Sequence, residues 1–429
     1  MKVALVNPAW RFDHSIYFGC REPHLPLELG YAQALLQRNG HETLMLDGQL
    51  QDMDAATLAA VVTAFGPDMV VVTTAPTYLF WRCAPPELRV PRDMIRRLHG
   101  IGAVLVAVGP HGSATPRAAL HKLGIDVVLR GECEQSILAL ADAGRPDAVP
   151  GATWRTAVGH IKVSGLPAVA RFTDTPPLAW PDAWVHRHRH HHHRFDMIPD
   201  VPGAEVEASR GCPYDCSFCA KIDFRDSYRR RDLDLLLAEI DRLISQGVGY
   251  IYFVDEIFLP QRPLLLALRD RDIKFGVQTR IDLWKPEMIT LLGEAGCVSI
   301  EAGIESLTPE GRAALDKNCR LSTKELSDRL VQARRVVPFV QANLIRSTGD
   351  DMAMVAAWRD SLRNQGVWAN DPVPMFPYPS SPEYRHLWGD PDDQAWERAL
   401  NHYLGAFDQF SDIQDNRPLP LPVLEDMAC

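Results

Sequence analysis

The chain has 429 residues, which is long enough for two or three domains with sizeable buried cores. With 46% hydrophobic and 23% charged residues it has the composition of an ordinary globular enzyme, and a formal charge of -10 argues against a nucleic-acid partner held mainly through its phosphates. The first residues lack the charged and apolar regions of a secretory signal, and no apolar run is long enough to span a membrane, so we expect a cytoplasmic protein.

Residues 1–150 alternate short apolar runs with helical segments. We expect strands at 3–6, 43–46, 69–73, 103–108 and 126–129, separated by helices at 27–38, 55–65, 93–98 and 116–123. Near-continuous β-branched runs between helices are typical of a parallel sheet that is covered on both faces. The pattern predicts a doubly wound, Rossmann-like α/β domain whose ligands bind at the carboxyl ends of the strands.

The loops at these strand ends hold the candidate binding residues of the first domain. Small and hydroxyl-bearing residues there let the backbone approach a large ligand closely, although the same residue types also form ordinary turns. No G-x-G-x-x-G motif opens the first helix, which argues against a nicotinamide or flavin dinucleotide. The candidates are Asn7, Thr74, Tyr78, Gly109, His111, Gly131 and Glu132.

Residues 151–203 are predicted to connect two domains. A small hairpin is expected from 153–155 and 160–163, and four prolines between 167 and 181 should keep the following chain extended. Six of the eight residues from His186 to His193 are histidines. Such a tract can bind a metal, but a solvated segment is the alternative because the interleaved arginines oppose a bound cation.

Residues 204–385 again alternate strands and helices. We expect strands at 204–209, 250–254, 274–279, 297–302, 338–345 and 368–376, with helices at 233–246, 263–268, 286–295 and 323–336. Repeated βα units of this size predict a partial (β/α)6 barrel, in which the carboxyl ends of the strands face the active site. Residues 386–429 are expected to form a short helical tail.

Three cysteines, Cys212, Cys216 and Cys219, directly follow the first strand of this barrel. Three thiolates on one short loop can ligate three irons of a 4Fe–4S cluster and leave the fourth iron open. A structural zinc site is the alternative, but it usually takes four ligands, and no second cysteine pair follows. Polar residues follow the next three strands, where they serve either a ligand or the start of a helix. They are Asp255, Glu256, Arg280, Glu305 and Ser306.

In this order the motifs resemble those of radical S-adenosylmethionine (SAM) enzymes with an N-terminal cobalamin-binding domain, a class B-type methylase family. The C-x3-C-x2-C run from Cys212 to Cys219 carries most of the resemblance, which covers roughly residues 1–385. Weaker matches are Gly303-Ile304-Glu305-Ser306, Leu315-Asp316-Lys317, Pro26-Leu27-Glu28-Leu29-Gly30-Tyr31, Gly109-Pro110-His111 and Arg130-Gly131-Glu132.

The resemblance implies roles for the barrel residues. The three cysteines would hold the cluster, and SAM would chelate its open iron through the methionine amine and carboxylate. Asp255 or Glu256 would accept from the SAM ammonium, and Arg280 would pair with its carboxylate. Glu305 or Ser306 would meet the ribose hydroxyls, and Phe218 would pack near the adenine.

The resemblance also implies a reaction. An electron from a flavodoxin- or ferredoxin-like reductant would release a 5′-deoxyadenosyl radical from SAM, and the first domain would bind cobalamin through its seven candidate residues. We expect methylation of an unactivated carbon of a small molecule held between the domains. A radical cyclase, oxidase or rearrangement enzyme is the main alternative, and a cobalamin or cluster sensor is a further one.

The sequence departs from the family in two places. It lacks a D-x-H-x-x-G signature, so cobalamin would bind without a histidine under the cobalt, with Tyr78, Phe80 or Trp81 facing it, unless the domain is vestigial. At the fifth barrel strand, residues 344–351 replace the family's Gly-rich, acid-containing turn, and they predict no defined SAM contact.

Overall fold

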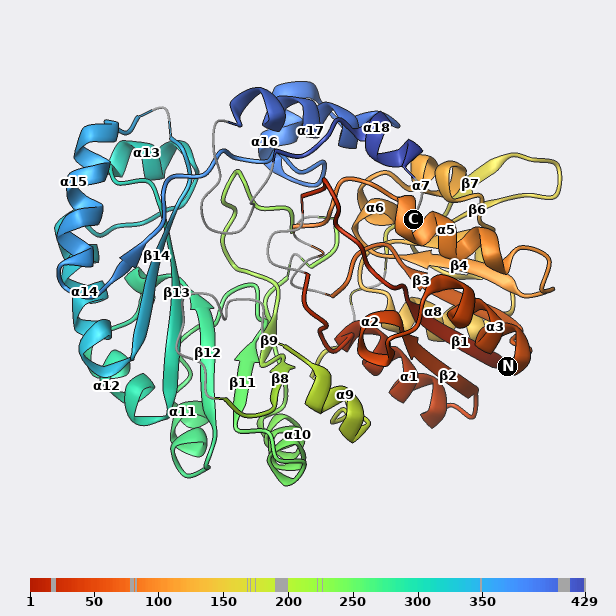
Figure 1. The fold of residues 1–429 in the computed structure, drawn as a ribbon, viewed down its shortest axis with the longest axis horizontal. Coiled ribbons are helices and arrows are strands. Elements are labelled where there is room, and N and C mark those ends of the chain that lie inside the picture. Colours follow the sequence, from red (N-terminus) through yellow and green to blue (C-terminus); the bar gives the residue numbers. More distant parts are fainter. Residues whose placement is uncertain are drawn as a thin grey trace.

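Two mainly parallel sheets dominate the molecule, and the last helices of the chain lie across both of them (Figure 1). The computed structural model describes residues 1–16, 21–77, 81, 83–167, 169, 171–173, 175–189, 200–221, 223–225, 227–347, 349–407 and 417–427. The predictions made for Tyr78, Phe80 and His190 to His193 lie outside these residues.

The first sheet has the strand order β2-β1-β3-β4-β5-β6-β7. Its parallel strands are β1 (Lys2–Asn7), β2 (Glu42–Asp47), β3 (Met69–Thr73), β4 (Val104–Val108) and β5 (Val127–Leu129), and all five were predicted from apolar runs. The predicted hairpin consists of β6 (Ala152–Arg155) and β7 (Ile161–Val163). Strand β6 pairs antiparallel with β5, so the hairpin extends the first sheet.

Helices cover both faces of this sheet, because successive strand residues point to opposite sides. One face packs with α1 (Leu27–Arg38) and α8 (Glu134–Ala143), and the other with α3 (Ala55–Phe65), α5 (Arg89–Leu98) and α7 (Pro116–Leu123). Shorter helices are α2 (Gly48–Gln51), α6 (Pro110–Ala114) and η1 (Pro146–Ala148). The predicted doubly wound α/β architecture is confirmed, although α8 was not predicted.

The second sheet has six strands, all parallel, in the order β15-β14-β13-β12-β11-β8. They are β8 (Gly203–Val206), β11 (Tyr250–Phe253), β12 (Lys274–Thr279), β13 (Cys297–Glu305), β14 (Phe339–Leu344) and β15 (Trp368–Ala369). The predicted partial barrel is confirmed. The last strand is much shorter than the predicted 368–376, because after Ala369 only an isolated bridge from Val373 to Ile345 continues the pairing.

Helices lie along the outside of the barrel (Figure 1). They are α10 (Leu233–Ser245), α11 (Arg262–Arg269), α12 (Pro286–Glu294), α13 (Pro309–Ala314), α14 (Thr323–Val336) and α15 (Met352–Arg363), together with the turn η2 (Ile281–Leu283). The described part of the chain has no helix that is both long and apolar enough to cross a membrane.

One part of the connecting segment is helical, which corrects the prediction of an extended chain. Helix α9 (Asp182–Arg187) begins directly after Pro181. A proline at this point does not obstruct a helix, because the first-turn amides have no helical partner anyway. Trp184 and Val185 are buried, and Trp184 stacks on Trp180, so hydrophobic packing favours the helix.

The C-terminal helices α16 (Pro382–Trp388), α17 (Ala395–Ala406) and α18 (Leu421–Asp426) connect the two sheets (Figure 1). Arg385 pairs with Asp223 of the barrel at 3.1 Å. Glu425 pairs with Lys122 of the first domain at 3.0 Å. The predicted helical tail therefore ties both sheets together at the top of the molecule.

Candidate active site

The three cysteines lie in a loop whose two ends are held together. Strands β9 (Ser209–Arg210) and β10 (Arg229–Arg230) pair antiparallel, with Arg210 opposite Arg229. Gly211 has φ +75°, and a Cβ atom there would overlap the carbonyl oxygen of Ser227, so this position requires glycine. We call residues 211–228 the cysteine loop and the β9–β10 pair its neck.

Within this loop the thiols sit among charged groups from several strand ends. Cys216 is buried, and Cys212 and Cys219 are half-buried. Burial raises the pKa of the Cys216 thiol, while the charges of Lys317 and Arg280 act in the opposite direction. Among the described residues, no group of three or more His, Cys, Asp or Glu side chains lies as close together as a single metal ion requires.

The two carboxylates that follow β11 accept hydrogen bonds from the residues that lead into the cysteine loop. Asp255 accepts from the Ala208 amide at 2.9 Å and from the Ser209 hydroxyl. Burial raises the Asp255 pKa to about 7, against the lowering effect of these hydrogen bonds. Glu256 accepts from the Gly211 amide at 2.7 Å. One of these two residues was predicted to accept from the SAM ammonium, which remains a prediction; in the structure both accept from the chain that enters the loop.

Arg280, at the end of β12, faces the cysteine loop. Its guanidinium lies 4.2 Å from the centroid of the Tyr214 ring and pairs with Asp282 at 2.8 Å. Burial lowers the Arg280 pKa, but the hydrogen bond and charge of Asp282 outweigh burial and raise it overall. Its Nη1 atom is buried and has no hydrogen-bond partner among the described residues. A carboxylate is the group that such a nitrogen would bind best.

The predicted residues at the end of β13 have different partners. Glu305 adopts φ +67° and pairs with Lys317 at 3.1 Å. The charges of both residues act on the Cys216 thiol. Ser306 is fully buried, and its hydroxyl donates to Asp350 at 2.9 Å. Phe218 is half-buried within the cysteine loop.

In the first domain, Asn7 ties three strand ends together. Its amide nitrogen donates to Asp47 at 2.6 Å, and its oxygen accepts from Thr73 at 2.8 Å and from Trp10 at 2.7 Å. Burial raises the pKa of Asp47 to about 7, against the opposing hydrogen bond from Asn7. Through these contacts Asn7 stabilises the edge of the sheet. Its predicted contact with cobalamin remains a prediction.

The loops after β3 and β4 lie against each other. The hydroxyls of Thr74 and Thr77 are buried without a partner among the described residues, and a Cβ atom on Gly109 would overlap the Thr74 hydroxyl. His111 is buried and its ring stacks on Trp396 of α17, with centroids 4.3 Å apart. Burial lowers the His111 pKa to about 3, so this side chain is neutral.

Trp81 and Gly131 bring the first domain into contact with other segments. Trp81 is buried, and its ring lies 5.5 Å from Phe224, just beyond the third cysteine. The predicted contact of Trp81 with cobalamin remains a prediction. Gly131 has φ +72° and lies so close to Pro167 that an added Cβ atom would come within 2.9 Å of it.

Glu132 has two arginine partners that were not predicted. It accepts from Arg210 at 3.3 Å and from Arg229 at 3.0 Å, and both arginines belong to the neck. Arg210 also pairs with Glu134 at 2.6 Å and Glu207 at 3.0 Å. The one available signal was the position of Arg210, directly before Gly211 and Cys212; nothing in the sequence indicated its partners.

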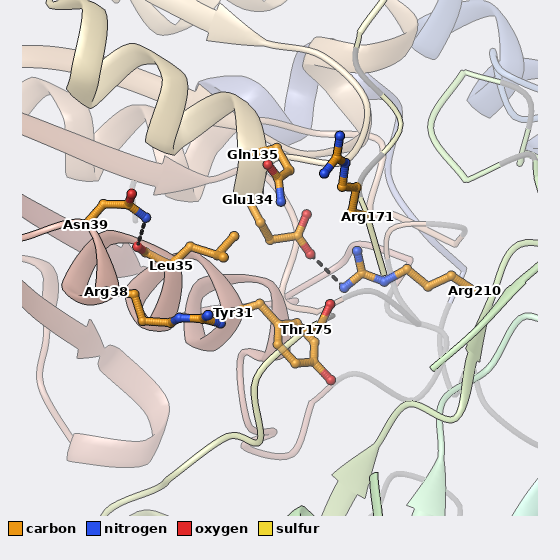
Figure 2. A pocket seen from close by; sticks show the side chains of 9 residues that line it. All are labelled: Tyr31, Leu35, Arg38, Asn39, Glu134, Gln135, Arg171, Thr175 and Arg210. Carbon is orange, nitrogen blue, oxygen red and sulfur yellow. Dashed lines mark hydrogen bonds and ion pairs between the residues drawn. The ribbon is translucent and has the colours of Figure 1, made fainter. Parts of the chain in front are cut away.

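Two cavities adjoin the neck. One of about 350 Å³ is lined by Arg210, Glu134 and Tyr31, with Arg38 and Arg171 among the other lining residues (Figure 2). The other, of about 210 Å³, lies between the loop after β5 and the end of the cysteine loop. Its lining includes Ser113, Arg130, Glu132, Asp223, Phe224 and Arg229.

Two family models match separate parts of the chain. Residues 20–141 match the B12 binding domain, and residues 206–349 match the radical SAM superfamily. The first match covers strands β2 to β5 of the first sheet but not β1, and the second covers the cysteine loop and most of the barrel.

Known proteins resemble the chain over both parts. An uncharacterized methyltransferase of Pyrococcus horikoshii is 24% identical over 72% of this chain and 66% of its own length. The anaerobic magnesium-protoporphyrin IX monomethyl ester cyclase of Rubrivivax gelatinosus is 24% identical over 84% of this chain and 66% of its own length. The chain thus spans about two thirds of these curated relatives.

Among solved structures, the radical SAM methyltransferase TsrM of Kitasatospora setae, with cobalamin and a [4Fe-4S] cluster bound, superposes with a TM-score of 0.67. It is 21% identical, and the match covers 89% of this chain and 73% of that one. At this identity the likeness shows a shared fold.

Proposed function

Because the chain carries a B12 binding domain followed by a radical SAM superfamily domain, we propose that it is a cobalamin-dependent radical SAM methyltransferase. Its substrate is a small molecule with an unactivated carbon, and its electrons come from an external one-electron reductant. The observation that carries the proposal is the cysteine loop, closed by its neck at the carboxyl edge of an open parallel barrel and faced by the buried Arg280.

The residues present fit the three cofactors. Cys212, Cys216 and Cys219 are thiols outside any disulfide and lie on one loop, as three ligands of a 4Fe–4S cluster require. The unpartnered Nη1 of Arg280 suits the SAM carboxylate. The buried hydroxyl of Thr74, packed against Gly109, suits a large ligand at the carboxyl edge of the first sheet.

When bound, the cluster and SAM supply a carbon-centred radical, and cobalamin supplies a methyl group. The chain's own residues bind and orient these groups and keep water away. Asp255 and Glu256 fix the entry of the cysteine loop through the amides of Ala208 and Gly211. Arg280 presents a fixed positive charge beside the loop.

Radical cyclisation is a second candidate. It is favoured by the similarity to the Rubrivivax cyclase, which extends over more of this chain than the similarity to the Pyrococcus methyltransferase. The two candidates share the cofactors and differ in whether a methyl group reaches the product.

Anaerobic reconstitution with iron, sulfide and cobalamin tests the proposal. We expect about four irons per chain and co-eluting cobalamin, and release of 5′-deoxyadenosine from SAM under reductant. Cys216→Ala should lose the cluster. Cys319→Ala, which removes another half-buried thiol, should keep it.

Isotope labelling separates the candidates. Label from the SAM methyl group should appear in the product of a methyltransferase and be missing from that of a cyclase. A full cluster in Cys216→Ala would refute the ligand assignment, and reconstituted protein that retains no cobalamin would refute methyl transfer through cobalt.

A further inference from the structure

We propose that Glu132 is a positioning residue that fixes the neck of the cysteine loop against the strand ends of the first domain. The inference rests on the proposed function, because the two edges that it joins are the predicted sites of the cluster and of cobalamin. It assigns Glu132 to the link between those sites instead of to cobalamin itself.

Glu132 reaches the neck with both carboxylate oxygens. It follows β5 by three residues and is only 3% exposed. Its Oε2 atom accepts from Arg210 Nη1 at 3.3 Å and from Arg229 Nη1 at 3.0 Å, and its Oε1 atom accepts from Arg229 Nη2. The pair with Arg229 is bidentate, which fixes orientation as well as distance.

The two arginines are cross-strand neighbours in the neck. Arg210 is paired in register with Arg229, so one carboxylate from the first domain holds both strands. The cysteine loop begins directly after Arg210 and ends directly before Arg229. A shift of Glu132 therefore acts on both ends of the loop at once.

The barrel holds the same neck from its own side. Arg210 pairs with Glu207 at 3.0 Å, and the buried Arg225 of the loop pairs with Glu207 and, at 2.6 Å, with Glu256. Figure 2 shows the Arg210 guanidinium directed at Glu134, the first residue of α8. Carboxylates of both domains thus meet at one arginine.

Because of these additional partners, we expect that the charge of Glu132 can be removed without unfolding the protein. If its charge is removed, Arg210 keeps Glu134 and Glu207 as partners, and Arg229 is 18% exposed and so has access to solvent. The Glu132→Gln variant should fold, while the neck loses its bidentate tie to the end of β5.

Hydrogen exchange of the cofactor-free protein tests the link. In Glu132→Gln we expect exchange of the amides in 209–231 to rise about tenfold or more, which corresponds to about 1.4 kcal/mol of local opening. Arg229→Gln should give most of the same increase, and the double variant should add little to that of Glu132→Gln, since both single variants remove the bidentate pair and only Glu132→Gln also removes the contact with Arg210. Asp241→Asn, which breaks the pair of Asp241 with Arg271 on the barrel surface, should leave these amides unchanged.

A spectroscopic readout follows the loaded protein. Glu132→Gln should bind iron and cobalamin in full, but the magnetic interaction between the reduced cluster and cobalt(II) should broaden or weaken in its paramagnetic resonance spectrum. Wild-type protein that loads neither cofactor would refute the proposed function. Full loading, with exchange and spectra identical in wild type and Glu132→Gln, would overturn the role of Glu132 alone.

Discussion

The substitution Glu256→Gln distinguishes two possible roles of the acidic pair Asp255 and Glu256, which follows β11. The family resemblance implies a contact with the SAM ammonium, whereas the observed contacts assign Glu256 to the cysteine loop. Glu256→Gln keeps the shape and one acceptor oxygen for the Gly211 amide, but removes the charge opposite Arg225. We therefore expect the variant to be impaired before any SAM is added.

The size of this effect follows from burial. The side chains of Glu256 and Arg225 are 1% and 0% exposed, so solvent screens the pair very little. Breaking such a pair costs about 3–5 kcal/mol, and we expect the lower end of this range because Arg225 keeps Glu207 as a partner. A net loss of about 3 kcal/mol should lower the melting temperature of a domain of roughly 150–250 residues by about 6–12 °C.

Scanning calorimetry of the anaerobic, cofactor-free protein measures this loss. Asp241→Asn is the matched control, because its ion pair lies at the surface and contributes about 0–1 kcal/mol. If Glu256→Gln melted within about 2 °C of the wild type, loaded its cluster fully and lost only SAM affinity, Glu256 would be a ligand of SAM and the structural argument would be wrong.

Three further predictions concern other parts of the site. Arg280→Met should keep its iron and bind SAM roughly 10–100-fold more weakly in equilibrium dialysis, because a charge-assisted bond to the carboxylate is lost; unchanged affinity would contradict the fit. His111→Phe should gain stability relative to wild type as the pH falls from 7 to 5 in thermal melts. The unfolded imidazole takes up a proton near pH 6.5, whereas the buried ring, with its pKa of about 3, does not. Melting temperatures of the two proteins that change in parallel with pH would exclude this. Trp396→Ala should lower stability by about 3–5 kcal/mol and speed exchange at 110–115, since it removes the ring that covers His111; unaltered exchange there would show that α17 is not needed to hold this loop.

Local signals explain why much of the fold could be predicted. Helix α14 has the predicted bounds because Ser322 and Glu325 form a capping box at its start. Helix α3 is equally well marked, with an Asp54 cap at one end and the left-handed Gly66 at the other. Strand β15 was overestimated because β propensity continues along the sequence after the pairing has ended at Ala369.

The site was only partly predictable, because its partners are distant in sequence. The three cysteines were recognisable from spacing alone. The strand-end rule also placed Asp255 and Glu132 at the correct edges. It did not indicate that Asp255 would hold Ser209, 46 residues away, or that Glu132 would bind Arg229, 97 residues away. A parallel sheet brings polar strand ends together, but their pairing depends on how the two domains pack.

This pairing narrows how the first domain can bind cobalamin. Three predicted contacts are engaged within the protein: Asn7 with neighbouring strands, His111 with Trp396, and Glu132 with the neck. Among the described residues of this edge, the hydroxyls of Thr74 and Thr77 are buried without a partner, and that of Thr74 lies beside Gly109. We therefore infer that cobalamin is recognised mainly by backbone groups and shape. A Gly109→Ala substitution should then weaken cobalamin binding more than Asn7→Ser, and the reverse order in a binding titration would restore Asn7 as the principal contact.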